Sequence, residues 1–175
     1  ARIPWLMLLM IGATFTGIIL NHFESALARV TALTLFIPML MDTGGNSGSQ
    51  CSVTVIRALS LGDIEFKDLL SVIWKEIRVA VLCGVSLAAV AFLKIMLVDH
   101  LLMQNDDVTI TVALVVCLTM ALVVLVAKVI GCTLPMLADK VGLDPAVMSS
   151  PFITTIVDAL CLLIYFAIAS QLLAL

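Results

Sequence analysis

The sequence is short of charged residues. Of its 175 residues only 12% are Asp, Glu, Lys or Arg, whereas a soluble domain carries about 25%. Nine basic residues against twelve acidic ones give a net charge of −3, so the chain lacks the basic excess that nucleic-acid binding requires. Hydrophobic residues make up 63%, more than a chain of this length can bury in water. The composition predicts one integral membrane domain and excludes a nucleic-acid partner.

Common enzyme motifs are missing as well. The sequence contains no Gly-x-Ser-x-Gly elbow and no Gly-x-x-x-x-Gly-Lys-[Ser/Thr] loop, and no nucleophile–base pair is visible. The five cysteines form no Cys-x-x-Cys pair, and the two histidines have no second ligand at metal spacing. We therefore expect a protein that is not an enzyme and has no soft-metal site.

Five apolar segments are long enough to cross a bilayer, which takes about 20 residues of helix. The predicted spans cover residues 4–20, 26–59, 69–98, 108–138 and 145–175. The predicted fold class is all-α, with five transmembrane helices in one ion-conducting domain, 1–175. The chain enters its first apolar run almost at once, which predicts a piece cut from a longer protein.

The distribution of basic residues predicts the orientation. The connections after the second and fourth spans contain Arg57, Lys67, Lys75, Arg78 and Lys140, whereas residues 99–107 contain no Lys or Arg. Because basic residues accumulate in cytoplasmic connections, we expect a multi-pass protein of the cell (inner) membrane. Its N-terminus would be cytoplasmic and its C-terminus extracytoplasmic.

The second span is interrupted by polar residues and glycines. Pro38 precedes a run, 42–50, that reads Asp-Thr-Gly-Gly-Asn-Ser-Gly-Ser-Gln. Because proline and glycine weaken a helix and these side chains are rich in oxygen, we predict a kink or break there that faces a watery cavity. The alternative is close helix packing, since Gly44-x-x-x-Gly48 is a small-residue contact pattern.

The last span carries a carboxylate, Asp158, near its middle. A carboxylate at that depth is costly and persists mainly where it is paired or faces water. The span has no Lys, Arg or His, but Thr154 and Thr155 lie one turn earlier on the same face. These oxygens favour a cation site. The alternative is an ion pair between Asp158 and Lys128 of the fourth span.

A single Asp is a weak site for a divalent ion, but two copies related by a two-fold axis would present two carboxylates. Mg²⁺ keeps several of its waters when bound, so a wide ring of oxygens contacting those waters suits it. Hard oxygen ligands also suit Mn²⁺, Co²⁺ or Ca²⁺, and the residues alone do not choose among these ions.

Two ordered motifs resemble the membrane domain of MgtE-type magnesium channels. The first is the run Pro-Met-Leu-Met-Asp-Thr-Gly-Gly-Asn-Ser-Gly-Ser-Gln at 38–50. The second comprises Gly131, Leu134-Pro135, Asp144-Pro145-Ala146, Ser149-Ser150-Pro151, Thr154-Thr155 and Asp158. With the five spans and their orientation, the resemblance covers essentially the whole chain.

The resemblance implies a homodimer whose pore lies at the two-fold axis, between the second and fifth spans. It assigns the pore carboxylate to Asp158 and a backbone carbonyl contact to Thr154. Further pore-lining candidates are Gly44, Gly45, Asn46 and Ser150. It also implies that the full-length protein has a cytoplasmic N-terminal domain and paired CBS domains that sense internal Mg²⁺, and neither is in this chain.

The leading hypothesis is a dimeric Mg²⁺ channel or transporter domain in the lipid bilayer, with Mg²⁺ as the transported ion. One alternative is a proton- or sodium-coupled carrier in which Asp158 relays the coupling ion. Another is a membrane anchor or assembly module that conducts nothing.

Overall fold

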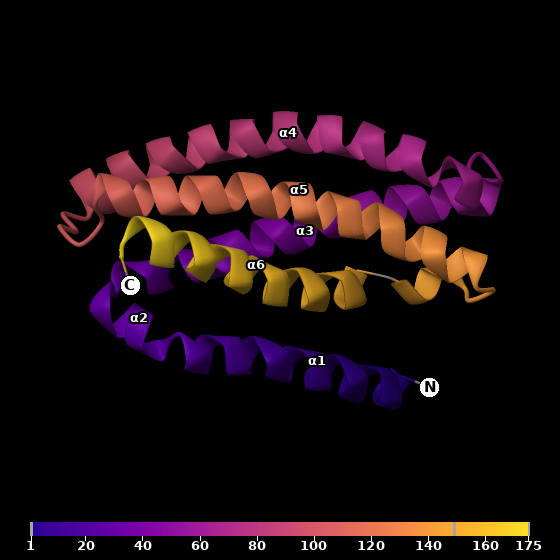
Figure 1. Cartoon of the computed structure of the whole chain (residues 1–175), viewed down its shortest axis with the longest axis horizontal. Coiled ribbons are helices and arrows are strands. Elements are labelled where there is room, and N and C mark those ends of the chain that lie inside the picture. The colour runs from indigo at the N-terminus through magenta and orange to yellow at the C-terminus, as the bar shows by residue number, and fades with distance from the viewer. Residues whose placement is uncertain (1, 149, 175) are drawn as a thin grey trace.

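The protein is a bundle of helices that run up and down one long axis, with parallel as well as antiparallel neighbours (Figure 1). The computed structural model describes residues 2–148 and 150–174, and this part of the chain contains helices and no strands. The long helices are α1 (Arg2–His22), α3 (Ala32–Leu61), α4 (Leu69–Lys94), α5 (Ile110–Lys140) and α6 (Ser150–Leu172). Shorter elements are α2 (Glu24–Arg29), the 3₁₀ turns η1 (Phe66–Asp68) and η3 (Pro145–Met148), and a π-helical segment, η2 (Ile95–Leu102). The prediction of an all-α fold is confirmed.

Three of the described helical segments are long and apolar enough to cross a membrane. They are Phe66–Leu102, Ile110–Lys140 and Ser150–Leu172. A shorter apolar helix covers Leu6–His22. Helix α3 has 30 residues, but its centre holds the polar run 42–50, which lowers its hydropathy. By length and composition the chain is therefore a membrane protein with three candidate spans.

Of the kink or break predicted at residues 42–50, the break is wrong. Helix α3 is continuous from Ala32 to Leu61. It begins later than the predicted residue 26, because residues 30–31 are not helical and separate it from α2. Two threonine hydroxyls in this part of α3 bond back to the carbonyl one turn earlier. Thr43 Oγ1 donates to the Met39 carbonyl at 2.7 Å, and Thr54 Oγ1 donates to the Gln50 carbonyl at 2.9 Å.

The last span also starts later than predicted. Residues Pro145–Met148 form a separate 3₁₀ turn, and helix α6 begins at Ser150. The Asp144 carboxylate accepts a hydrogen bond from the Ala146 amide at 2.9 Å, which stabilises the turn. Pro151 then occupies the first turn of α6, where a missing N–H breaks no helical hydrogen bond.

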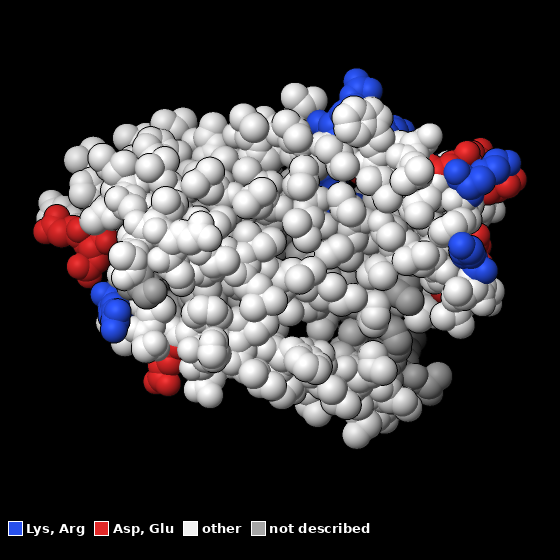
Figure 2. Space-filling model, in the orientation of Figure 1, with Lys and Arg blue, Asp and Glu red and all other residues white. Residues whose placement is uncertain are grey.

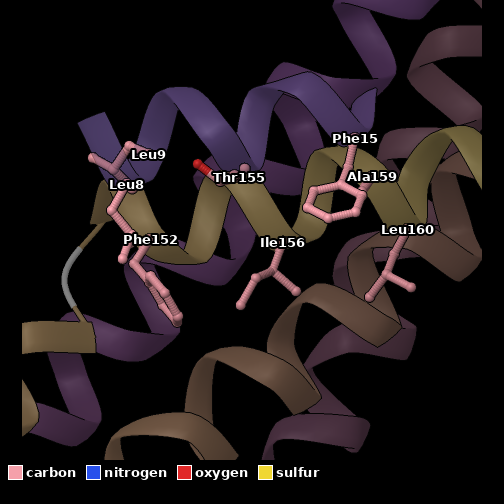
Figure 3. Close-up of a pocket in the computed structure, with 9 residues that line it drawn as sticks. Leu8, Leu9, Phe15, Phe152, Thr155, Ile156, Ala159 and Leu160 are labelled. Atoms are coloured by element: carbon pink, nitrogen blue, oxygen red, sulfur yellow. The ribbon is translucent and has the colours of Figure 1, made fainter. Parts of the chain in front are cut away.

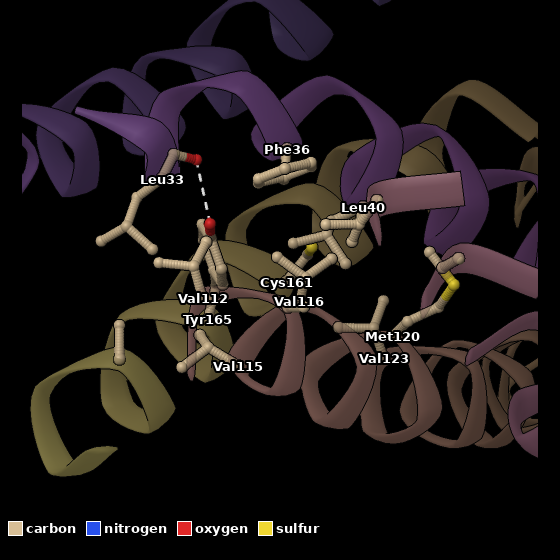
Figure 4. Packing of buried hydrophobic residues seen from close by; sticks show 14 of the residues in the cluster. Leu33, Phe36, Leu40, Val112, Val115, Val116, Met120, Val123, Cys161 and Tyr165 are labelled. Atoms are coloured by element: carbon tan, nitrogen blue, oxygen red, sulfur yellow. Dashed lines mark hydrogen bonds between the residues drawn. The ribbon is translucent and has the colours of Figure 1, made fainter. Parts of the chain in front are cut away.

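Helices α3, α5 and α6 enclose the main core (Figure 4). Val116 and Met120 of α5, Phe36 of α3 and Cys161 of α6 all belong to this core. The hydroxyl of Tyr165 in α6 donates to the buried Leu33 carbonyl in α3 at 2.9 Å. This core fixes α3 against α6, which matters for the site described below.

Glycines set the close approach of α3 to α5. A Cβ built on Gly131 of α5 would collide with the Gly48 carbonyl oxygen of α3. A Cβ on Gly48 would lie 2.9 Å from Ile153 Cγ2 and 3.1 Å from the Ala127 carbonyl oxygen. The two backbones are therefore in contact at this level, and no larger residue fits without a shift.

Charged side chains gather at the two ends of the bundle, and the face between them is almost entirely uncharged (Figure 2). Helix α1 begins at one end and α6 finishes at the other (Figure 1). The end where α1 begins also holds the α3–α4 and α5–α6 connections, with Arg57, Lys67, Lys75, Arg78 and Lys140. The opposite end holds Glu24, Asp99, Asp106 and Asp107, with Arg29 and Lys94.

Candidate cation site

Asp158 faces a polar cavity between α3 and α6. The cavity has a volume of about 270 Å³ and is lined by Met41, Asp42, Gly45, Asn46, Thr154 and Asp158. Asp158 is half-buried, and its carboxylate has no hydrogen bond or ion pair with the residues that the structure describes. A carboxylate in this state is available to a ligand in the cavity.

Helical spacing places the contributing residues on facing sides. Asp42, Gly45 and Asn46 lie at positions i, i+3 and i+4 of α3 and so share one face. Thr154 and Asp158 lie at i and i+4 of α6. The two faces meet across the cavity because the α3–α6 core, including the Tyr165 bond, holds the helices together.

Gly45 is the residue that lets α3 approach α6 at the site. A Cβ there would lie 3.0 Å from Thr154 Cγ2 and 3.9 Å from Asp158 Oδ1. A side chain at this position would therefore crowd Thr154 and intrude toward the carboxylate.

The cavity contains four of the six predicted site residues. Asp158, Thr154, Gly45 and Asn46 all line it. Gly44 instead faces the core, where a Cβ would lie 2.5 Å from Val123 Cγ1 and 3.0 Å from Val157 Cγ1. Close helix packing thus explains the glycines at Gly44 and Gly48. Gly45 instead lines the polar cavity.

Ser150 also lies outside this cavity lining. Its hydroxyl donates to the Ser49 hydroxyl at 2.9 Å, which joins the start of α6 to α3. Thr154 Oγ1 donates to the Pro151 carbonyl at 3.0 Å. Its lone pairs remain free to accept a hydrogen bond from the cavity.

Lys128 does not pair with Asp158. Its ammonium group contacts Glu76 of α4 at 3.3 Å, and the two side chains are only 11% and 14% exposed. The alternative that Asp158 serves in a structural ion pair with Lys128 is therefore wrong.

Asp42 lines the cavity but is not among the site residues predicted from the sequence. Asn46 Nδ2 donates to Asp42 Oδ2 at 3.0 Å, and both residues line the cavity with Asp158. The signal was present in the sequence, because Asp42 lies one helical turn before Gly45 and Asn46 in the same motif.

A second polar cavity lies between α3, α4 and α5, on the other side of Asp42 and Asn46. It is also about 270 Å³ in volume and is lined by Asp42, Thr43, Asn46, Ser47, Gln50, Cys83, Leu87 and Lys128. Asp42 and Asn46 therefore border both polar cavities.

A larger cavity between α1 and α6, about 380 Å³, is apolar (Figure 3). Leu8 and Phe15 of α1 and Ile156 and Leu160 of α6 are among its lining residues. The hydroxyl of Thr155 in its wall already donates to the Pro151 carbonyl at 2.8 Å. Apart from this hydroxyl, the side chains that line the cavity are apolar, so it is a poor cation site.

One chain does not complete a metal centre. Among the described residues, no group of three or more His, Cys, Asp or Glu side chains is placed to hold a metal ion. The polar cavity provides two carboxylates, an amide and a hydroxyl, all hard ligands.

Comparison with known proteins identifies the family. Residues 37–168, which include both sides of the polar cavity, match the MgtE family, described as a divalent cation transporter. This chain is an MgtE family member. The magnesium transporter MgtE of Thermus thermophilus is 37% identical over 99% of the chain. The proteins of the same name from Bacillus subtilis and Enterococcus faecalis are 36% and 35% identical over 97%.

The chain spans 36% of the length of each of these relatives. MgtE proteins are transporters, so the family agrees with the expectation that the chain is not an enzyme. The family resemblance seen in the sequence is confirmed.

Proposed function

We propose that residues 1–175 form the ion-conducting membrane domain of a magnesium transporter, with Mg²⁺ as the transported ion. The observation that carries the proposal is the free Asp158 carboxylate facing a polar cavity between two helices of an otherwise apolar bundle. The name of the relatives, magnesium transporter, supports Mg²⁺ as the cargo. Mn²⁺, Co²⁺ and Ca²⁺ are the competing ions to test at the same site.

The site recognises a hydrated ion. Mg²⁺ releases its waters reluctantly, so carboxylate oxygens accept hydrogen bonds from the bound waters more readily than they replace them. The Asp158 carboxylate on α6 accepts such hydrogen bonds from the ion's waters. The oxygens of Thr154, one turn earlier on the same helix, accept them as well. The absence of a complete group of metal ligands in the described residues of one chain fits a site that contacts waters.

A homodimer completes the site. The polar cavity has ligands from α3 and α6 only, and a two-fold axis beside it would bring a second Asp158 to the same ion. The pore then runs between α3 and α6 of both copies, and each copy crosses the membrane five times, with α1 and α3 joining the three apolar candidate spans.

The N-terminus lies in the cytoplasm and the C-terminus outside the cell membrane. Two features support this orientation: α1 begins and α6 ends at opposite ends of the bundle, and basic residues concentrate where α1 begins. In the full-length protein, cytoplasmic N-terminal and CBS domains regulate this domain from that side.

The central test is Mg²⁺ uptake into liposomes. Asp158→Asn keeps the size of the side chain and removes its charge, so we expect uptake at low Mg²⁺ to fall roughly tenfold or more, and Asp158→Ala to abolish it. Asp106→Asn, which removes an exposed carboxylate from the α4–α5 connection, is the matched control and should leave uptake unchanged. Uptake by Asp158→Asn at the unaltered rate would reject the assignment.

The same liposomes separate the alternatives. The exchange-inert hexaamminecobalt(III) ion, which resembles a hydrated cation, should block uptake if waters are what the site contacts. A coupled carrier would lose uptake when the proton or sodium gradient is collapsed, whereas a conducting pore would not. A membrane anchor would show no uptake with any ion.

A further inference from the structure

Asp42 is an exposed carboxylate ten residues into α3, about 15 Å along the helix. At that depth an exposed carboxylate against lipid would cost several kcal/mol, so its face must meet water or another polar surface. The cavity beside it supplies that surface, because Asp158 and Thr154 of α6 line the opposite wall.

The charge of Asp42 is not balanced by a basic partner. Lys128 borders the second polar cavity together with Asp42, but its ammonium group bonds to Glu76 at 3.3 Å. Within the part of the chain that the structure describes, Asp42 has no ion pair and accepts one hydrogen bond, from Asn46.

Asn46 orients that carboxylate. Its Nδ2 donates to Asp42 Oδ2 at 3.0 Å from the next turn of α3, which leaves Asp42 Oδ1 as the oxygen free to accept further bonds. Gly45, between the two, keeps the wall of the cavity open toward Asp158. The three residues at i, i+3 and i+4 thus form one polar face aimed at α6.

We propose that Asp42 is a second cation-contacting residue, and that its carboxylate and that of Asp158 hold the hydrated ion from opposite walls of the α3–α6 cavity. This inference rests on the proposed function, since it adds a residue to the same site. Two negative charges on opposite walls favour a divalent over a monovalent cation, because the attraction grows with the charge of the ion. Asn46 is a positioning residue for Asp42.

The test compares Mg²⁺ binding to the wild-type chain in detergent, by calorimetry, with binding to Asp42→Asn. The amide oxygen of the new side chain can still accept the bond from Asn46, so the variant removes charge and little else. We expect the affinity for Mg²⁺ to fall roughly tenfold and the preference over Na⁺ in liposome flux to fall with it. Asp106→Asn is the control and should bind as the wild type does.

Asp42→Glu tests whether a loss of Mg²⁺ affinity comes from altered folding or side-chain shape rather than from the lost charge. Because it keeps the charge, it should bind within a few-fold of the wild type and unfold at the same temperature without Mg²⁺. Wild-type affinity in Asp42→Asn, or an equal loss in Asp42→Asn and Asp42→Glu, would overturn the inference.

Binding and flux together separate the two proposals. If the wild type binds Mg²⁺ and Asp42→Asn does not, while neither conducts, the role of Asp42 stands and the proposed transport function fails. If the wild type conducts and Asp42→Asn binds and conducts equally well, transport stands and the role of Asp42 fails. A wild-type chain that neither binds nor conducts Mg²⁺ rejects both.

Discussion

At the scale of single residues, the Lys128–Glu76 pair places two opposite charges between α4 and α5. Both side chains are nearly buried, and the Lys128 carbonyl also accepts a hydrogen bond from the Cys51 thiol at 3.3 Å. Since an unpaired buried charge is costly, each member of the pair depends on the other.

Glu76→Gln should therefore destabilise the protein by about 3 kcal/mol, because it leaves the Lys128 charge buried without a counter-charge. The double variant Glu76→Gln/Lys128→Met should recover most of that loss. Thermal unfolding in detergent measures both. An unfolding temperature for Glu76→Gln equal to the wild type would show that the pair is solvated and of little energetic value.

Sequence alone could bring together residues whose placement follows from their own helix, although their role in ion binding stays a prediction. Asp158 and Thr154 share a face by spacing alone, and Gly45 and Asn46 follow from their motif. The partner of Lys128 was not predictable in this way, because it lies 52 residues earlier on another helix, and only the packing of α4 on α5 selects Glu76 over Asp158.

At the scale of elements, helix α3 differs most from expectation. Glycine and proline predicted a broken helix, yet α3 is continuous and lies in close contact with α5. Helix propensity alone could not predict this, because the stabilising partner is a tertiary contact: Gly48 against Gly131. The existence of the helices was predictable from hydropathy, whereas the continuity of α3 was not.

Gly131→Ala should destabilise the protein by about 1–3 kcal/mol, because the new methyl group collides with the Gly48 carbonyl oxygen, which cannot move independently of α3. Gly17→Ala in α1 is the matched control, since a Cβ there meets nothing within 4 Å. That variant should be neutral or slightly stabilising. Equal unfolding temperatures for the two variants would show that the α3–α5 contact is looser than described.

At the scale of the whole molecule, the polar cavity is open on one side and its ligands come from two helices of one chain. The two-fold axis that we propose would close it. Helix α4, by contrast, presents exposed apolar side chains such as Leu82 and Val85, a surface suited to lipid.

Mixing wild-type and Asp158→Asn chains before reconstitution tests the paired site. If an ion needs both carboxylates, uptake should follow the square of the wild-type fraction, so an equal mixture retains about a quarter of the full rate. Chains that work alone would retain about a half. Refolding the two chains together, with separately prepared samples mixed afterwards as the control, distinguishes these outcomes.

Helix α1 packs mainly against α6, the last helix of the chain. During synthesis, α1 therefore has no lasting partner until residues 150–172 have been made. The polar face of α3 likewise gains its α6 wall only at that moment. The order of translation thus makes α6 the helix that completes the packing of both α1 and α3. A chain released before α6 is made would leave α1 unpacked and the polar face of α3 uncovered in the membrane, where quality control could recognise them.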